Sequence, residues 1–202
     1  MKKSFTSILI VAAVVAGLCG FTTAVLGQAD AGLVSGFLNQ AKSASDSQLG
    51  DIASELTGKV QSLGAAAGTN SAVTGKLDST LKALTGGEDS AALTSAFGLV
   101  KGAKLTPEQL GLAKQVGNLA SAYVVQKNFA SLEGQQGDVA TIVSSLRSGN
   151  IKAAVPPLKN VATSAKLTDT QKQLITTVAD KYAPGFSKAA GALDRVKKLP
   201  GF

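Results

Sequence analysis

The sequence predicts an all-α protein, either a compact multi-helix bundle or a short helical array. Three observations indicate this fold class. The chain is rich in Ala, Leu, Lys, Gln and Ser and holds only 4% aromatic residues. Apolar side chains recur three and four positions apart, most clearly from Thr106 to Phe129, which is the spacing of one helix face. No segment alternates apolar and polar residues with the period of two that marks a strand.

Nine helices are expected, joined by loops short enough to make consecutive helices antiparallel. Their expected ranges are Gly32–Ser43, Asp46–Leu63, Ser71–Leu84, Asp89–Lys101, Pro107–Phe129, Asp138–Arg147, Pro157–Ala165, Asp169–Tyr182 and Gly185–Lys197. The expected core anchors are Phe37, Leu56, Leu81, Phe97, Leu119, Val143, Ile175 and Val178.

Helix starts carry a recognisable capping pattern. Thr106 is expected to be an N-cap, with Pro107 at the first helical position and Gln109 completing a capping box. Leu105 and Leu110 are then placed to staple the chain entry.

The same pattern recurs with Thr168 and Gln171, and with Ser45 and Gln48. We therefore expect three helices that begin in the same way. The pair Pro156-Pro157 should instead make the helix that follows Asn150 restart or bend, because proline lacks the N–H that a helix interior needs.

The neighbourhood of these caps also recurs. Residues 33–37, LVSGF, match LTSAF at 93–97, and AKLT at 103–106 returns at 165–168, an offset of 62. We interpret this as three degenerate units, 31–87, 88–149 and 150–202, each with two or three helices. The alternative is that an alanine- and leucine-rich helical sequence matches itself by chance.

The N-terminus has the order of a secretory signal peptide. Two lysines at positions 2–3 precede an unbroken apolar run at 8–16, and small residues follow at Gly27 and Ala29. We expect cleavage after Ala29, so that 1–29 is removed and a single helical domain remains at 30–202. The protein would then be exported, to the periplasm or outside the cell.

Three alternatives stay open at this end of the chain. Cleavage after Ala31 also suits a small-residue site. The apolar stretch from Phe5 to Leu26 is long enough to remain as an uncleaved membrane anchor. Cys19 allows a lipoprotein, although Leu18 stands where a small residue normally precedes a lipidated cysteine. The resemblance that these residues carry is only a general one, to small exported bacterial helical proteins that begin with two lysines.

Composition removes most catalytic chemistry. The chain has no histidine and no tryptophan, and its one cysteine, Cys19, leaves with the signal. Zinc sites draw on Cys and His, and His is the commonest general base near neutral pH. We expect no catalytic residue, no cofactor and no metal site. Asp51 and Glu55 share a helix face, but we expect them to be surface charges, with Glu55 paired to Lys59 four residues later.

Positive charge gathers at the C-terminal end. The whole chain carries a formal charge of +7, and residues 150–202 hold nine basic and three acidic side chains. This end is a candidate surface for an anionic lipid or polymer. Scarce aromatic residues argue against single-stranded nucleic acid as the partner. The candidate residues are Lys152, Lys159, Lys166, Lys181, Lys188, Arg195, Lys197 and Lys198.

The sequence thus favours an exported, non-enzymatic helical protein that binds a partner or helps to build the cell envelope. One alternative is a carrier of lipid or another apolar ligand, with its basic end at an anionic membrane. A remote alternative is an enzyme, which would need a pocket that gathers lysine, tyrosine and carboxylate side chains with perturbed acidity.

Overall fold

The computed structural model describes residues 30–44, 46–101, 104–164 and 166–188, and within them it contains eight labelled α-helices, a further helical turn at 186–188, and no strand. The all-α prediction is therefore confirmed for these ranges. The helices are α1 (Ala31–Ser43), α2 (Ser47–Ala67), α3 (Ser71–Gly86), α4 (Asp89–Gly98), α5 (Pro107–Phe129), α6 (Gln136–Ser148), α7 (Ile151–Ala162) and α8 (Asp169–Tyr182).

Two capping boxes form as predicted. The Thr106 hydroxyl accepts a hydrogen bond from the Gln109 N–H at 3.3 Å, and the Gln109 side chain accepts one from the Thr106 N–H at 3.0 Å. Thr168 and Gln171 repeat the arrangement at 3.2 and 3.0 Å. These local bonds explain why α5 and α8 begin where the sequence places them.

The cap of α2 differs from the expected one. Asp46 is its N-cap, and the Asp46 carboxylate accepts a hydrogen bond from the Gln48 N–H at 2.9 Å. Ser45, the expected cap, lies outside the described residues. Aspartate serves as well as serine at this position because either side chain offers an oxygen to the first free N–H groups.

Of the two outcomes expected at the double proline, the restart of the helix is wrong. The helix does not restart at Pro157, since α7 begins at Ile151 and runs through Pro156 and Pro157. Each proline removes one hydrogen bond, to the carbonyl of Lys152 and of Ala153 respectively. Both of those residues are exposed, and an exposed carbonyl can accept a hydrogen bond from water in place of the missing donor.

The core draws on every helix. Seven of the eight expected anchors are buried, and Phe97 alone is only half-buried. The helix expected at Gly185–Lys197 lies mostly outside the described residues. None of the helices that the structure describes is long and apolar enough to cross a membrane.

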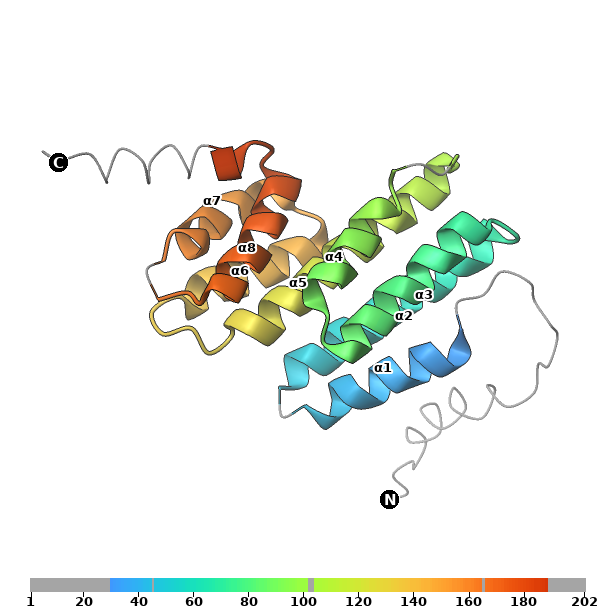
Figure 1. The fold of residues 1–202 in the computed structure, drawn as a ribbon, viewed down its shortest axis with the longest axis horizontal. Coiled ribbons are helices and arrows are strands. Elements are labelled where there is room, and N and C mark those ends of the chain that lie inside the picture. Colours follow the sequence, from blue (N-terminus) through green and yellow to red (C-terminus); the bar gives the residue numbers. More distant parts are fainter. Residues whose placement is uncertain (1–29, 45, 102–103, 165, 189–202) are drawn as a thin grey trace, which may run out of the picture.

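Helix α5 lies at the centre of the arrangement, between α1–α3 on one side and α6–α8 on the other (Figure 1). Its start meets the end of α2, where Gln109 Nε2 donates to the Ala66 carbonyl at 2.6 Å. Its end meets the start of α2, where Gln126 Nε2 donates to Asp46 Oδ2 at 2.7 Å. Helices α2 and α5 are therefore antiparallel.

Helix α8 meets α5 in the same manner. Gln171, in the first turn of α8, donates through Nε2 to the Asn128 carbonyl near the end of α5 at 2.8 Å. Helix α4 packs against both α5 and α8. The three helices α4, α5 and α8 thus enclose the region that holds the candidate site.

Candidate functional site

A pocket of about 390 Å³ lies between α4, α5, the start of α7 and the end of α8. We call it the α4–α8 pocket. Its wall is mostly apolar and includes the side chains of Phe97, Val100 and Ile151. Two lysines, Lys114 and Lys181, also line it. An apolar cavity with a few polar groups is the usual form of a small-molecule site.

Tyr182, the last residue of α8, lines this pocket. Its ring meets the Phe97 ring edge to face, with 6.2 Å between centroids and 84° between planes. Its hydroxyl donates to Asn118 Oδ1 at 2.9 Å and lies 3.2 Å from Ser121 Oγ. Burial raises the pKa of Tyr182 well above its usual range. The phenol therefore stays protonated and holds α8 on α5.

Lys181 places a positive charge at the same pocket. Its Nζ atom lies over the Phe97 ring, 5.0 Å from the centroid, which is a cation–π contact. Burial lowers the pKa of Lys181, and the nearby charges of Lys101 and Lys114 lower it further. Among the described residues, none of these three lysines forms an ion pair with a carboxylate. The pocket therefore carries positive charge that the described part of the chain leaves unpaired.

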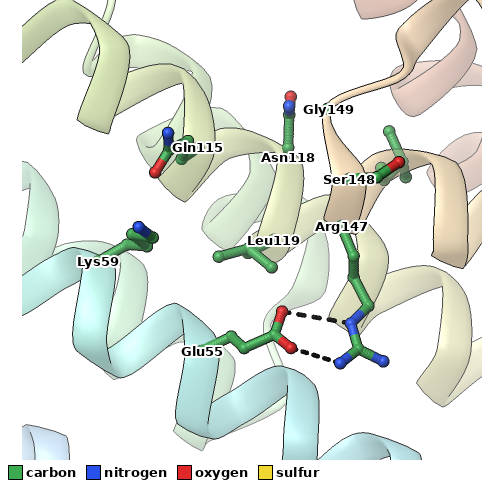
Figure 2. Close-up of a pocket in the computed structure, with 9 residues that line it drawn as sticks. Glu55, Lys59, Gln115, Asn118, Leu119, Arg147, Ser148 and Gly149 are labelled. Carbon is green, nitrogen blue, oxygen red and sulfur yellow. Dashed lines mark hydrogen bonds and ion pairs between the residues drawn. The ribbon is translucent and has the colours of Figure 1, made fainter.

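A second, more polar pocket of about 330 Å³ adjoins the first, and Asn118 and Gly149 line both (Figure 2). Two hydrogen bonds from the Arg147 guanidinium to the Glu55 carboxylate form its clearest feature, one of them from Nε at 3.2 Å. The hydrogen bond to Glu55 raises the pKa of Arg147. Because the two charges neutralise each other, this pocket offers less free charge than the α4–α8 pocket.

The predicted pair of Glu55 with Lys59 is thereby corrected, since Glu55 binds Arg147 instead. A guanidinium presents two parallel N–H donors to a carboxylate, whereas the ammonium of Lys59 presents a single point charge. Lys59 lines the polar pocket but pairs with no carboxylate that the structure describes.

A second aromatic pair stands elsewhere on α5. The rings of Phe37 in α1 and Tyr123 in α5 also meet edge to face, with 5.0 Å between centroids and 61° between planes. Phe37 is fully buried and Tyr123 is 4% exposed. Burial, followed by the charge of Asp89, raises the pKa of Tyr123. This pair belongs to the closed core.

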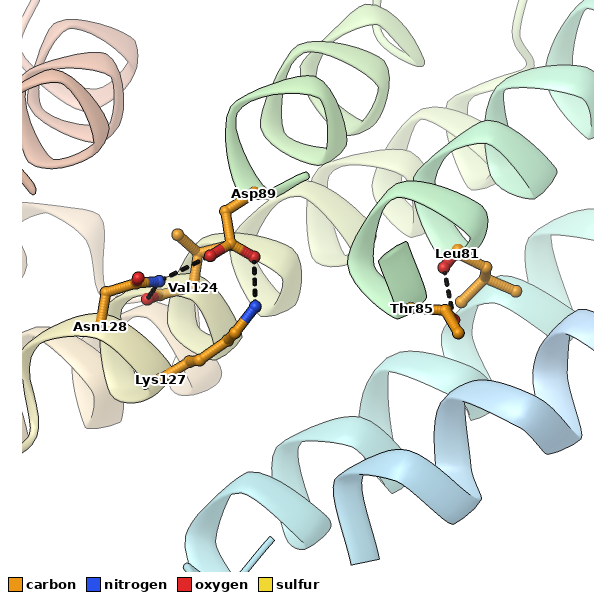
Figure 3. A network of polar contacts seen from close by, with 6 residues as sticks. All are labelled: Leu81, Thr85, Asp89, Val124, Lys127 and Asn128. Atoms are coloured by element: carbon orange, nitrogen blue, oxygen red, sulfur yellow. Dashed lines mark hydrogen bonds and ion pairs between the residues drawn. The ribbon is translucent and has the colours of Figure 1, made fainter. Parts of the chain in front are cut away.

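Asp89 is a buried carboxylate at the start of α4 with all of its obvious partners in place (Figure 3). It accepts hydrogen bonds from Lys127 Nζ at 2.9 Å and from Asn128 Nδ2 at 2.8 Å. Asn128 Nδ2 also donates to the Val124 carbonyl at 2.8 Å. We interpret this network as a clamp between α4 and the end of α5, because each oxygen of the buried carboxylate accepts a hydrogen bond from α5.

The structure describes five of the eight residues of the predicted basic surface. Lys152 and Lys159 are exposed on α7, and their spacing of seven places them on one face. Lys166 lies 3.7 Å from Glu133, and Lys188 is exposed after α8. The contact of this surface with an anionic lipid or polymer stays a prediction.

Of the candidates that the structure describes, Lys181 alone lines the pocket. Arg195, Lys197 and Lys198 lie outside the described residues. Sequence reasoning did not place Lys101 and Lys114 near Lys181, because both belong to segments far from Lys181 along the chain. The sequence did hold one signal for this region of the molecule. Phe97 matches Phe37 within the recurring segments, so both segments carry an aromatic residue at the same position.

The described ranges contain no group of three or more His, Cys, Asp or Glu side chains that could hold a metal ion. No protein-family model matches the chain, and no curated protein and no solved structure matches it either.

Proposed function

We propose that this chain is an exported, non-enzymatic binding protein of the cell envelope or secreted fraction. We further propose that its helices form three degenerate units, 31–87, 88–149 and 150–202, and that it binds an apolar ligand in the α4–α8 pocket. The support comes from contacts that recur between units and from one contact that differs.

Hydrogen bonds recur between successive units at the same spacing. Gln109 donates to the Ala66 carbonyl, and Gln171 donates to the Asn128 carbonyl, each across 43 residues. Adding the sequence offset of 62 to the first pair gives the second. This agreement supports the three-unit interpretation, because a chance match of sequence has no reason to preserve a tertiary hydrogen bond.

A second pair of contacts follows the same offset. Lys76 Nζ donates to the Gly98 carbonyl, and Asn160 Nδ2 donates to Asp138 Oδ2 at 3.3 Å, each across 22 residues. The chemistry differs, since an ammonium has been replaced by a carboxylate and the direction of donation has reversed. The place of the contact is the same, as expected for units that have diverged.

The observation that carries the binding proposal is the difference between the two aromatic pairs. Phe37 and Phe97 occupy matching sequence positions, and each meets a tyrosine of the following unit. Phe37 is fully buried, whereas Phe97 is half-buried and faces a cavity of about 390 Å³. A contact that closes the core at one junction leaves room for a ligand at the next.

The α4–α8 pocket holds only some of the side chains that the enzyme alternative requires. The α4–α8 pocket gathers two lysines and Tyr182, but no carboxylate is among the residues that line it. Burial raises the pKa of Tyr182, so the phenol stays protonated near neutral pH and is not available as a general base. Ligand binding therefore accounts for the pocket better than catalysis does.

Binding is tested with a neutral apolar fluorophore, N-phenyl-1-naphthylamine, whose emission rises in an apolar site. Gly117→Leu should abolish the emission, because a Cβ at Gly117 already lies 3.6 Å from the Phe97 ring and the remaining side chain fills the pocket. Gly111→Leu is the matched control on the same helix, since a Cβ at Gly111 meets no atom within 4 Å.

Equal probe binding in both glycine variants would contradict the proposed site. If Gly117→Leu does not fold, Val100→Phe obstructs the same pocket from the opposite wall and serves in its place.

Export is tested separately, by intact mass and cell fractionation of the protein from its native host. A soluble species that begins near Asp30 supports the proposal. A full-length species in the membrane fraction would contradict cleavage and favour an N-terminal anchor.

A further inference from the structure

We propose that the α4–α8 pocket selects a small amphipathic anion, a carboxylate with an apolar chain or ring. The apolar part lies against Phe97, Val100 and Ile151, and the carboxylate accepts hydrogen bonds from Lys181 and Lys114. This inference rests on the proposed function, because it names the class of ligand for the same pocket.

The distribution of charge indicates an anion. Lys181 and Lys114 line the pocket and Lys101 lies close enough to repel Lys181. No ion pair to a described carboxylate offsets these three charges. Ammonium groups held near one another beside apolar surface raise the free energy of the protein. A bound anion relieves this repulsion, so that it gains binding free energy that a neutral ligand of equal size does not.

The position of Lys181 indicates that the ligand has an apolar part as well. Its Nζ atom lies over the ring of Phe97, 5.0 Å from the centroid, so the positive charge lies directly beside the apolar wall of the pocket. A ligand that reaches both must carry its charge at one end and its apolar surface beside it. A small inorganic anion would satisfy the lysines but would leave Phe97, Val100 and Ile151 uncovered.

The adjoining polar pocket offers a carboxylate less positive charge, because Lys59 lines it whereas both Lys114 and Lys181 line the α4–α8 pocket. Arg147 of the polar pocket is already paired with Glu55 by two hydrogen bonds, as Figure 2 shows. A second carboxylate at Arg147 would be repelled by Glu55 or would have to displace it. The anionic group therefore belongs on the side of Lys181.

The volume restricts the size of the ligand. A cavity of about 390 Å³ is near the small end of ligand pockets, which span about 300 to 1,000 Å³. It suits a medium-chain or aromatic carboxylate. A diacyl phospholipid would not fit inside it, so a membrane lipid is not the occupant that we infer.

The test compares three ligands of one chain length by isothermal titration calorimetry of the full-length protein. Octanoate carries a negative charge, octan-1-ol is neutral, and octylammonium is positive. We expect octanoate to bind about tenfold more tightly than octan-1-ol, the effect of one hydrogen bond to a charged group. Octylammonium should bind more weakly than octan-1-ol.

Variants then assign the preference to the lysines. Lys181→Met should remove most of the advantage of octanoate over octan-1-ol, while Lys181→Arg should keep it. Lys82→Met is the matched control, because it deletes an exposed lysine that does not line the pocket, and it should leave all three affinities unchanged. Melting temperatures of the variants establish that each is folded.

The failures of the two proposals are distinguishable. If octan-1-ol binds as tightly as octanoate and Lys181→Met changes neither, the pocket is apolar but indifferent to charge, which overturns this inference alone. If none of the three ligands binds and N-phenyl-1-naphthylamine does not bind either, both this inference and the proposed binding function are wrong.

Discussion

Two aromatic pairs that both meet edge to face have different surroundings in this molecule. The Phe37–Tyr123 pair is sealed inside the core, while the Phe97–Tyr182 pair borders a cavity. Both pairs join the first helix of one proposed unit to the second helix of the next. One edge-to-face contact therefore closes the core, while the other leaves a cavity beside it.

Local features explain why the second pair stays open. Gly117 faces Phe97 without a side chain, which leaves space beside the ring. Lys181 approaches the same ring from α8, and its charge resists complete burial. The space beside the ring therefore depends on the missing side chain at Gly117, and the charge beside it on Lys181.

The largest expected effect contrasts the two phenylalanines. Phe37→Ala should lower the free energy of unfolding by about 3 to 5 kcal/mol, because it leaves a cavity in a closed core. Phe97→Ala should lower it by only about 1 kcal/mol, since the ring is half-exposed, and it should weaken ligand binding. Urea denaturation measures both, and equal losses of stability would break the comparison.

A smaller effect tests whether the contact between the first and second proposed units is equivalent to the contact between the second and third. Gln109→Glu and Gln171→Glu each keep a side-chain acceptor for the capping box but replace the Nε2 donor to the neighbouring unit. Each should cost about 1 kcal/mol, the contribution of one hydrogen bond. The two losses should agree closely if the units correspond.

Gln48→Glu is the control for these variants. The Gln48 side chain is exposed and forms no hydrogen bond to another residue in the described part of the chain. Urea midpoints should fall for the two junction variants and not for this one. A loss at one junction alone would contradict their equivalence.

The smallest expected effect is the dependence of stability on pH through Lys181. Its pKa is lowered in the folded protein, first by burial and then by Lys101 and Lys114. Between that lowered value and 10.5, its value in the unfolded chain, the unfolded state holds more protons, and stability rises with pH. Wild type should therefore gain stability relative to Lys181→Met as pH rises through this window.

Tyr182 also faces this pocket and titrates at high pH, but it is present in both proteins and cancels in the difference. Parallel stability curves for wild type and Lys181→Met across this range would show that Lys181 bears no cost of burial.

Local sequence predicted those parts of the fold that depend on local bonds. The boxes at Thr106 and Thr168 lie within four residues of their partners, and both formed as expected. The predicted restart at the double proline did not occur. The energetic cost of these prolines depends on whether the carbonyls that lose an N–H donor can reach water. That depends on the exposure of Lys152 and Ala153, which only the folded structure supplies.

The candidate site was beyond the same reasoning, because its residues meet across long separations. Lys181 and Phe97 belong to different proposed units, and nothing in their spacing indicates a contact. Arg147 lies 92 residues from Glu55, so the nearer Lys59 was the natural partner to expect. Sequence identified Lys181 as basic and Phe97 as an anchor, but not that one stands over the other.

The central claim is that a ligand binds at the second aromatic pair and not at the first. An NMR titration of the isotope-labelled protein with octanoate tests it most directly. We predict that backbone amide signals of Phe97, Gly117, Lys181 and Tyr182 shift with a common affinity, while those of Phe37 and Tyr123 do not move. Shifts spread equally over both pairs, or confined to the exposed lysines of α7, would contradict the claim.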